Sequence, residues 1–159
     1  MQYQIICVGK IKEKFYAEAV QEYTKRLSRY ARITITEVSD EKTPDGASFA
    51  EEMQIKKKEA ERILSRIRDD HYVIALDISG KECDSVGFSR HLDSLMTRGK
   101  SQIVFIIGGS LGLHPSVLHR ANESVSFSKM TFPHPLMRVI LMEQIYRATK
   151  IQRGEPYHK

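Results

Sequence analysis

The chain has 159 residues, of which 41% are hydrophobic and 28% charged, a balance that fits one globular domain with a sizeable core. Lys and Arg number 25 against 20 Asp and Glu, and the net charge of +5 permits an anionic partner without requiring one. No apolar run has the length of a membrane span, and the first residues lack the apolar core of a signal peptide, so we expect a cytoplasmic protein with no contact with a membrane. The two cysteines lie far apart in the sequence, so we expect both to be free thiols.

Short β-type runs alternate with stretches of helical period along the whole chain. The predicted strands are residues 3–8, 33–38, 72–78, 103–107 and 124–127. The predicted helices are residues 13–30, 48–67, 85–96 and 133–152. Such alternation is typical of an α/β fold, in which a mostly parallel sheet carries helices on both faces. Because no repeat or long linker interrupts the pattern, we expect a single domain over residues 1–159.

The first two helices are predicted to be amphipathic. In the first, apolar residues at four-residue steps indicate one buried stripe: Phe15, Ala19, Tyr23 and Leu27. In the second, the predicted apolar side holds Met53, Ala60, Ile63, Leu64 and Ile67. Its opposite face is charged and is predicted to be solvated: Glu51, Glu52, Lys56, Lys57, Lys58, Glu59, Glu61 and Arg62.

The last helix differs because it is apolar over more than one stripe. One apolar row holds Met137, Leu141, Ile145 and Ala148, and a second holds Val139, Met142 and Tyr146. A helix of this kind is predicted to be buried on two sides, against its own sheet and against a partner.

A glycine pair, Gly108-Gly109, follows the apolar strand at residues 103–107. Glycines at this place let a backbone approach a ligand closely, and ligands of open α/β sheets bind at the carboxyl ends of the strands. The turn after the first strand has one glycine, Gly9, and lacks the dinucleotide-binding fingerprint. An adenosyl cofactor would therefore bind at the later glycine pair. The histidines lack metal-ligand spacing, so no metal is expected.

The same loop also matches the nucleophile-elbow pattern of serine hydrolases, with Ser110 between Gly108 and Gly112. A hydrolase would need a base and an orienting acid after Ser110, and no Asp follows Asp93. A small esterase is therefore a weak alternative.

Positive charge and aromatic rings gather toward the end of the chain. The residues concerned are Arg138, Arg147, Lys150, Arg153, Tyr157 and His158. Together they suit phosphate contacts and stacking on a splayed base in an RNA loop. For Arg147 an equally good interpretation is a simple pair with Glu143, four positions earlier on the helix.

Ordered motifs over the whole length carry a family resemblance. They are Val8-Gly9-Lys10 near the start, Phe105-Ile106-Ile107-Gly108-Gly109-Ser110, the segment SFSKMTFPH from Ser126 to His134, Met137-Arg138, Glu143-Gln144-Ile145-Tyr146-Arg147-Ala148, and Arg153-Gly154-Glu155-Pro156-Tyr157-His158. With these motifs the chain resembles the RlmH family of the SPOUT methyltransferase superfamily.

The resemblance implies a parallel α/β sheet whose C-terminal part forms a trefoil knot. It also implies a homodimer that binds S-adenosylmethionine and methylates N3 of pseudouridine 1915 in helix 69 of 23S rRNA within the ribosome. A ribosome-binding module without catalysis is the second alternative to this reading.

The resemblance also implies roles for individual residues. The expected cofactor-binding residues are Leu76, Gly108, Phe127, Ser128, Lys129, Met130, Thr131 and Phe132. The expected catalytic residues are Arg147, Tyr157 and His158, with the tail of one subunit completing the pocket of the other. His158 or a water that it orders would accept the N3 proton, and Arg147 would stabilise the anionic base. His134 is left open between a helix cap and a ligand contact.

Overall fold

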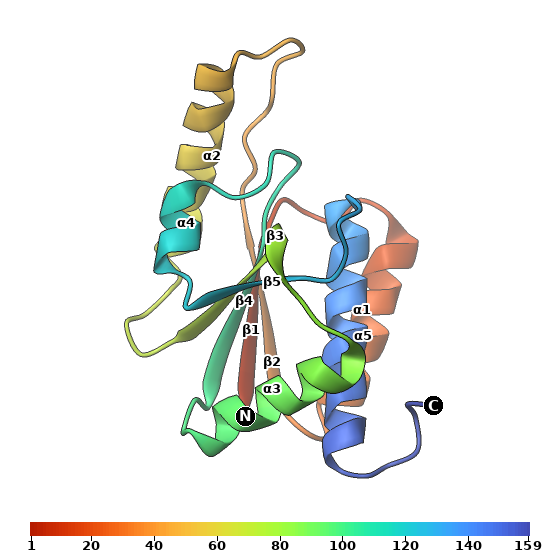
Figure 1. The fold of residues 1–159 in the computed structure, drawn as a ribbon. Helices are drawn as coiled ribbons and strands as arrows, with labels where there is room; N and C mark the ends of the chain where they lie inside the picture. Colours follow the sequence, from red (N-terminus) through yellow and green to blue (C-terminus); the bar gives the residue numbers. More distant parts are fainter.

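Five parallel strands form the centre of the molecule in the computed structural model, which describes residues 1–159 (Figure 1). They are β1 (Gln2–Val8), β2 (Arg32–Val38), β3 (Tyr72–Glu82), β4 (Gln102–Ile107) and β5 (Glu123–Ser126). The strand order is β2-β1-β4-β3-β5. The predicted α/β class with a parallel sheet is therefore confirmed; the trefoil knot stays a prediction.

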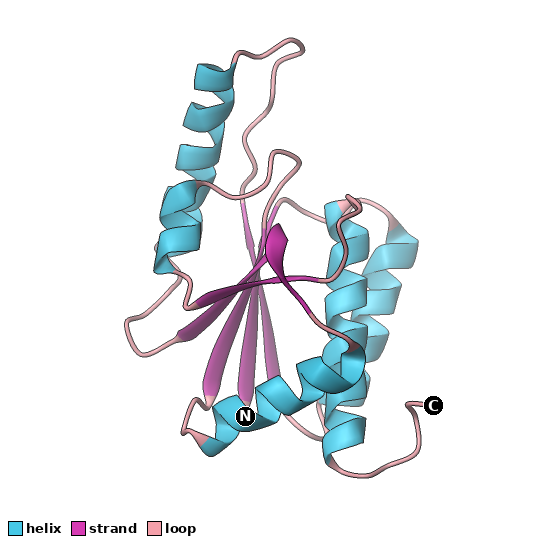
Figure 2. Cartoon of the chain, viewed as in Figure 1, coloured by secondary structure: helices cyan, strands magenta, loops and turns pink.

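Helices cover both faces of this sheet (Figure 2). One face is packed by α1 (Lys14–Leu27), α3 (Ser85–Thr97) and α5 (His134–Gln152), and the other by α2 (Phe49–Leu64) and α4 (Pro115–Arg120). Alternate side chains of β1 pack into two separate cores, because successive strand side chains point to opposite faces of the sheet. Ile5 lies in the core beneath α1, α3 and α5, and Ile6 lies in the core beneath α2 and α4. No helix is both long and apolar enough to span a membrane.

The predicted stripe on α1 is correct at its end and wrong at its start. Leu27 is fully buried, but Phe15 is 63% exposed, and Val20 is buried in its place. An α-helix turns through about 100° per residue, so each four-residue step drifts by about 40°. Three such steps rotate Phe15 about 120° away from Leu27. The inward line follows the buried Val20 and Leu27 and the half-buried Tyr23, whose spacing keeps closer to the helical period.

The predicted solvated face of α2 contains one exception. The helix begins with a capping box between Ser48 and Glu51, as its first turn favours. Glu59, however, is only 5% exposed, although it was expected among the solvated charges. It lies four positions before the buried Ile63 and therefore shares its face of the helix.

Strand β3 continues four residues past its predicted end and changes register on β5. Val125 pairs with both Leu76 and Lys81, so the strand bulges between these two positions. Gly80 lies inside this bulge, and a Cβ placed there would stand 2.7 Å from the backbone of Ser124 and Val125. The absence of a side chain at Gly80 is what allows β5 to lie so close to β3.

We expect the Gly80→Ala variant to be destabilised by about 1–3 kcal/mol, because the added methyl forces the β3 and β5 backbones apart. Urea unfolding followed by circular dichroism measures this change. Gly99→Ala is not a matched control, since Gly99 has a positive φ of 80°, so Ser79→Ala in the same strand segment serves instead. An unfolding free energy of Gly80→Ala equal to that of wild type would contradict this account of the bulge.

No residue of α5 is fully exposed, in agreement with the breadth of its apolar surface. Within the chain its neighbours are α1, α3 and the sheet. Arg138 is 2% exposed, and it donates to a Glu37 carboxylate oxygen at 2.7 Å and to the Gly9 carbonyl at 2.6 Å. The expectation that Arg138 presents charge to RNA phosphates is therefore wrong: its guanidinium ties α5 to the ends of β1 and β2.

Candidate functional site

The register of the sheet brings the predicted cofactor residues to one place. Leu76 pairs with Ile107 of β4, which directly precedes Gly108. Leu76 also pairs with Val125 of β5, two residues before Phe127. Three segments distant in sequence therefore meet at the carboxyl edge of the sheet, where α/β proteins bind ligands.

The glycine loop after β4 is closely packed. Its N–H at Gly112 donates to the Gly109 carbonyl at 3.1 Å. A Cβ at Gly108 would lie 3.0 Å from the Leu113 side chain and 3.1 Å from the backbone of Gly112. The loop therefore folds tightly on itself, and side chains larger than hydrogen do not fit at Gly108.

The structure gives no triad around Ser110. Ser110 is exposed and forms no hydrogen bond with a histidine. His114 instead accepts the Ser116 N–H through Nδ1 at 3.1 Å and caps α4. The loop therefore lacks the base that an esterase needs next to its nucleophile.

The segment after β5 is ordered by its own hydroxyls. Ser126 donates its hydroxyl to the Ser128 carbonyl at 2.9 Å, and the Ser128 hydroxyl accepts from the Met130 N–H at 3.0 Å. The Phe127 ring meets Phe88 of α3 edge to face, with centroids 5.4 Å apart. Phe127 thus fixes the segment to the core, while Met130 is 71% exposed and free to contact a ligand.

A hollow of about 620 Å³ lies next to this segment, at the carboxyl ends of β1 and β2. Its lining includes Gly9, Lys10, Lys12, Phe15, Asp40 and His134. His134 opens α5 without capping it, and its Cε1 stands 3.4 Å from where a Cβ on Gly9 would lie. Its Nδ1 is buried without a hydrogen bond, and burial lowers the pKa of the ring, with the nearby Arg138 charge acting in the same direction. His134 is therefore neutral at pH 7.

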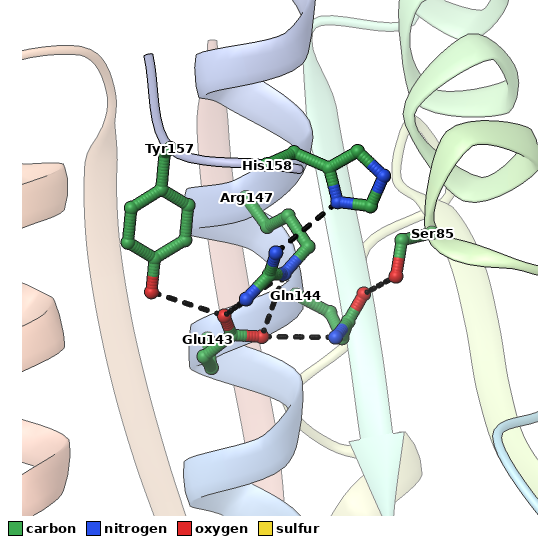
Figure 3. Close-up of polar contacts among 6 residues, drawn as sticks. All are labelled: Ser85, Glu143, Gln144, Arg147, Tyr157 and His158. Carbon is green, nitrogen blue, oxygen red and sulfur yellow. Dashed lines mark hydrogen bonds and ion pairs between the residues drawn. The ribbon is translucent and has the colours of Figure 1, made fainter.

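A second polar cluster, which we call the tail cluster, joins α5 to the end of the chain (Figure 3). It consists of Glu143, Arg147, Tyr157 and His158. Arg147 donates to the Glu143 carboxylate through Nε at 3.0 Å and through a terminal nitrogen at 2.5 Å. Tyr157 donates its hydroxyl to the same carboxylate at 3.1 Å. Arg147 also lies 3.1 Å from Nδ1 of His158 and 4.8 Å from the centre of the Tyr157 ring.

The structure thus brings all three predicted catalytic residues together and adds Glu143 as the common partner of Arg147 and Tyr157. The helical pair of Glu143 and Arg147 is formed, as the alternative interpretation expected. The four-residue spacing between Glu143 and Arg147 was the feature of the sequence that could identify Glu143 as a site residue. The pair does not stand alone on the surface, because the tail folds over it.

Two groups of the tail cluster, Tyr157 and Arg147, have raised pKa values. Burial raises the pKa of Tyr157 to about 12, helped by its hydrogen bonds with Tyr23 and Glu143. The hydrogen bond to Glu143 raises the pKa of Arg147. Tyr157 is therefore a protonated donor and Arg147 a cation. Glu143 is held from its other side by the Gln144 amide at 2.9 Å, which in turn accepts from Ser85 of α3 at 2.8 Å.

Glu155 anchors the tail just before this cluster. Its carboxylate accepts from Lys150 at 2.6 Å, Arg153 at 2.8 Å and the Tyr30 hydroxyl at 2.8 Å. These hydrogen bonds, that of Lys150 first, lower the pKa of Glu155 to about 2. Lys150 and Arg153, which were expected to face RNA phosphates, are thus engaged within the chain.

We expect the Glu155→Gln variant to release the tail, because the amide removes the charge that Lys150 and Arg153 share. Amide hydrogen exchange measures this as lost protection at Gly154 and Glu155, whose N–H groups donate to Ile151 and Lys150 carbonyls. In the wild type, a carboxyl with a lowered pKa holds the tail fully above pH 4.5 and releases it as the pH falls through about 2. Equal protection in variant and wild type at pH 7 would contradict the anchoring role.

The two groups of predicted residues lie at different levels of α5. The cofactor segment ends at Phe132, just before the first residue of α5, His134, whereas Arg147 lies thirteen positions further along the helix. At about 1.5 Å per residue this is roughly 20 Å. Figure 1 shows the tail at the opposite end of α5 from the carboxyl edge of the sheet. One chain alone therefore does not bring the tail cluster to its own cofactor residues.

Comparisons with known proteins identify relatives over the full length. A family model described as a predicted SPOUT methyltransferase matches residues 1–158. Proteins called ribosomal RNA large subunit methyltransferase H are 57% identical in Clostridium novyi and in Listeria monocytogenes, and 58% identical in Exiguobacterium sibiricum, over 159 residues and all of both chains. The structure of a probable methylase family protein from Haemophilus influenzae Rd KW20 superposes with a TM-score of 0.56 at 12% identity, over 99% of this chain and 70% of that one, which shows a shared fold.

Proposed function

Since the chain belongs to the RlmH family of SPOUT methyltransferases, we propose that it transfers a methyl group from S-adenosylmethionine to N3 of the helix 69 pseudouridine in 23S rRNA. The relatives carry the name of large-subunit rRNA methyltransferases at 56–58% identity over their full length. This full-length identity is the single observation that carries the proposal. The substrate is the rRNA within the ribosome, so the protein acts in the cytoplasm.

The glycine loop and the segment after β5 fit an adenosyl cofactor. A Cβ on Gly108 would meet Leu113 and Gly112 at 3.0–3.1 Å, so this position is restricted to glycine, and the backbone groups of such a loop can bond an adenine edge. Met130 and Phe132 can supply apolar surface, and Leu76 lies beside Ile107, the last residue of β4 before the glycine loop. When bound, S-adenosylmethionine supplies an activated methyl group on a sulfonium.

The tail cluster supplies the groups that a base with an acidic imide needs. The Arg147 guanidinium is a permanent cation and stabilises the imide anion that forms when N3 loses its proton. Because a guanidinium only donates, the Nδ1 of His158 accepts from it in the free chain. Movement of Arg147 onto the base then frees Nδ1 to take the proton, directly or through a water. A His158→Ala variant with wild-type activity would contradict this role.

Two subunits are needed for this arrangement. The roughly 20 Å along α5 between the cofactor segment and Arg147 separates the two halves of the site within one chain. We therefore infer a homodimer in which the tail cluster of one subunit completes the cofactor pocket of its partner. Half-buried apolar residues on α5, among them Leu136, Val139 and Ile140, provide surface for such a contact.

Incubation of the protein with labelled S-adenosylmethionine and ribosomes from a strain lacking the gene tests the function. We expect one label per ribosome at N3 of the helix 69 pseudouridine, located by nuclease mapping and mass spectrometry. Ribosomes from a strain that already carries the methyl group are the matched control and should take up none. Cofactor binding without label on 23S rRNA would contradict the proposed acceptor. Ribosome binding without cofactor binding would favour the non-catalytic module.

A further inference from the structure

A polar hollow of about 580 Å³ lies at the amino ends of β1, β2 and β4, on the face of the sheet that carries α2 and α4. Figure 1 shows α2 and α4 beside the carboxyl ends of the strands, and the segment from α2 to β3 running past their amino ends. From Gln2 to Val8, β1 spans roughly 20 Å at its rise of about 3.3 Å per residue. The hollow therefore lies at the opposite end of the sheet from the predicted cofactor residues, and the proposed mechanism does not use it.

The register of the strands explains why this end of the sheet is polar. On the α2 face of β1, Ile6 and Val8 belong to the core, whereas Gln2 and Gln4 precede it. The strand neighbours of Gln2 and Gln4 lie on the same face, and all but the buried Val104 are polar: Arg32 and Thr34 of β2, and Gln102 and Val104 of β4. Because α2 packs on the apolar half and ends at Leu64, no helix covers the polar half.

Cations line this hollow, and carboxylates do not. Its lining holds Arg32, Arg66 and Arg68 and contains no Asp or Glu. Arg68 forms an ion pair with the exposed Asp70 at 3.2 Å. Arg32 and Arg66 are exposed, and their guanidinium groups form no ion pair or hydrogen bond within the chain. Two guanidinium groups are therefore free to bind an anion.

The charge beside the hollow is positive as well. The Arg120 guanidinium donates to the carbonyl oxygens of Arg68 at 2.9 Å and His71 at 3.3 Å, and it has no acidic partner. Burial lowers the pKa of His71, and the charges of Arg68 and Arg120 act in the same direction against the effect of Asp70. One acid thus stands among four arginines, so the hollow is complementary to an anionic partner.

We propose that this hollow binds the phosphodiester backbone of ribosomal RNA, at a second contact away from the methylated nucleotide. The proposal rests on the proposed function, because it names part of the surface by which the enzyme recognises its substrate. Arginine binds phosphate oxygens through paired N–H donors, and the Gln and Thr side chains of the floor can donate to phosphate and sugar oxygens. The floor exposes no aromatic ring on which a base could stack, so the contact positions the RNA without reading its sequence.

Binding to unmethylated ribosomes between about 50 and 200 mM salt tests this contact. For the double variant Arg32→Ala/Arg66→Ala we expect a Kd weaker by about tenfold or more at the lowest salt. Each lost phosphate contact lowers the slope of log K against log salt by about 0.7–0.9, so the slope should fall by about 1.5. The single-turnover rate at saturating ribosomes should stay within about twofold of wild type, because the contact is roughly 20 Å from the cofactor edge. An unchanged Kd and slope overturn the proposal.

Two further variants keep the test decisive. Lys57→Ala/Lys58→Ala removes the same charge from the exposed face of α2 and should bind like wild type. An equal loss in this variant would show a general effect of net charge and overturn the proposal. Thr34→Glu places a carboxylate on the floor without removing an arginine and should weaken binding as the double arginine variant does.

The outcomes also separate this contact from the proposed function. Weaker binding of the arginine variant with an unchanged salt slope would overturn the proposal, because the partner would then be a ribosomal protein or an uncharged group. If the wild type methylates ribosomes and the arginine variant binds them equally well, only this contact fails. If the wild type transfers no methyl group, the proposed function fails, whereas a selective loss of binding and of salt slope in the arginine variant still supports the contact.

Discussion

The Arg147→Ala variant is expected to transfer methyl groups about 100- to 1000-fold more slowly than the wild type, with cofactor affinity unchanged. Arg147 is the one cation of the tail cluster, and alanine removes the charge that stabilises the deprotonated base. The single-turnover rate on ribosomes at saturating cofactor measures the effect on the chemical step. Calorimetry with S-adenosylmethionine separates it from an effect on the pocket.

Two matched variants accompany this measurement. Arg147→Lys keeps a positive charge but loses the planar fork that holds Glu143 through two nitrogens, so we expect an intermediate rate. Lys57→Ala removes an exposed lysine that makes no ion pair and should leave the rate unchanged. A rate for Arg147→Ala within twofold of wild type would show that the anion is stabilised by another group.

Mixing two inactive chains is expected to restore activity. In Gly108→Val the added side chain meets Leu113 and the Gly112 backbone and blocks the cofactor loop, while the tail stays intact. In Arg147→Ala the loop stays intact and the tail cluster is broken. A heterodimer of the two has one complete site, made from the intact loop of one chain and the intact tail of the other. It should show about half of the wild-type activity.

The two chains are co-expressed with different affinity tags and purified through both tags in sequence. Each homodimer alone is expected to be inactive, and thermal unfolding establishes that Gly108→Val remains folded. A double variant that carries both changes, paired with a wild-type chain, is the control for the geometry: each of its two sites then has either a blocked loop or a broken tail. Inactivity of the first heterodimer would mean that loop and tail of one chain work together, which the length of α5 opposes.

Periodicity and composition predicted the sheet and the long helices well. Apolar runs marked β1, β3 and β4, and the alternation of strands with helices gave the parallel α/β class. The errors have physical causes. Phe15 was placed on the buried stripe because a four-residue step approximates the helical period, and the drift accumulates over three steps. β3 was ended too early because its apolar run stops at Ile78, whereas the strand continues through Gly80, which admits β5.

The residues of the site were predicted by resemblance, and their arrangement was not. Strand register, which places Leu76 beside both Ile107 and Val125, cannot be derived from one chain without knowing the strand order. Glu59 escaped prediction because a glutamate among lysines on a helix usually faces water. Its burial depends on Gly109 of the glycine loop, which is distant in sequence and packs against the Glu59 carboxylate. Glu143 was visible as a helical pair, but its hydrogen bond from Tyr157 required the fold of the tail.

The strand order also determines when the sheet can be completed during synthesis. Each pair of neighbouring strands is parallel, so no hairpin forms early, and β1 pairs with β4 through contacts such as Tyr3 with Ile103. Until the ribosome has released β4, one edge of β1 has no strand to bond. Folds dominated by such distant pairings fold in about milliseconds to seconds. The nascent chain therefore presents an apolar strand edge to its surroundings for most of its translation, and this interval is where binding by a chaperone would prevent aggregation.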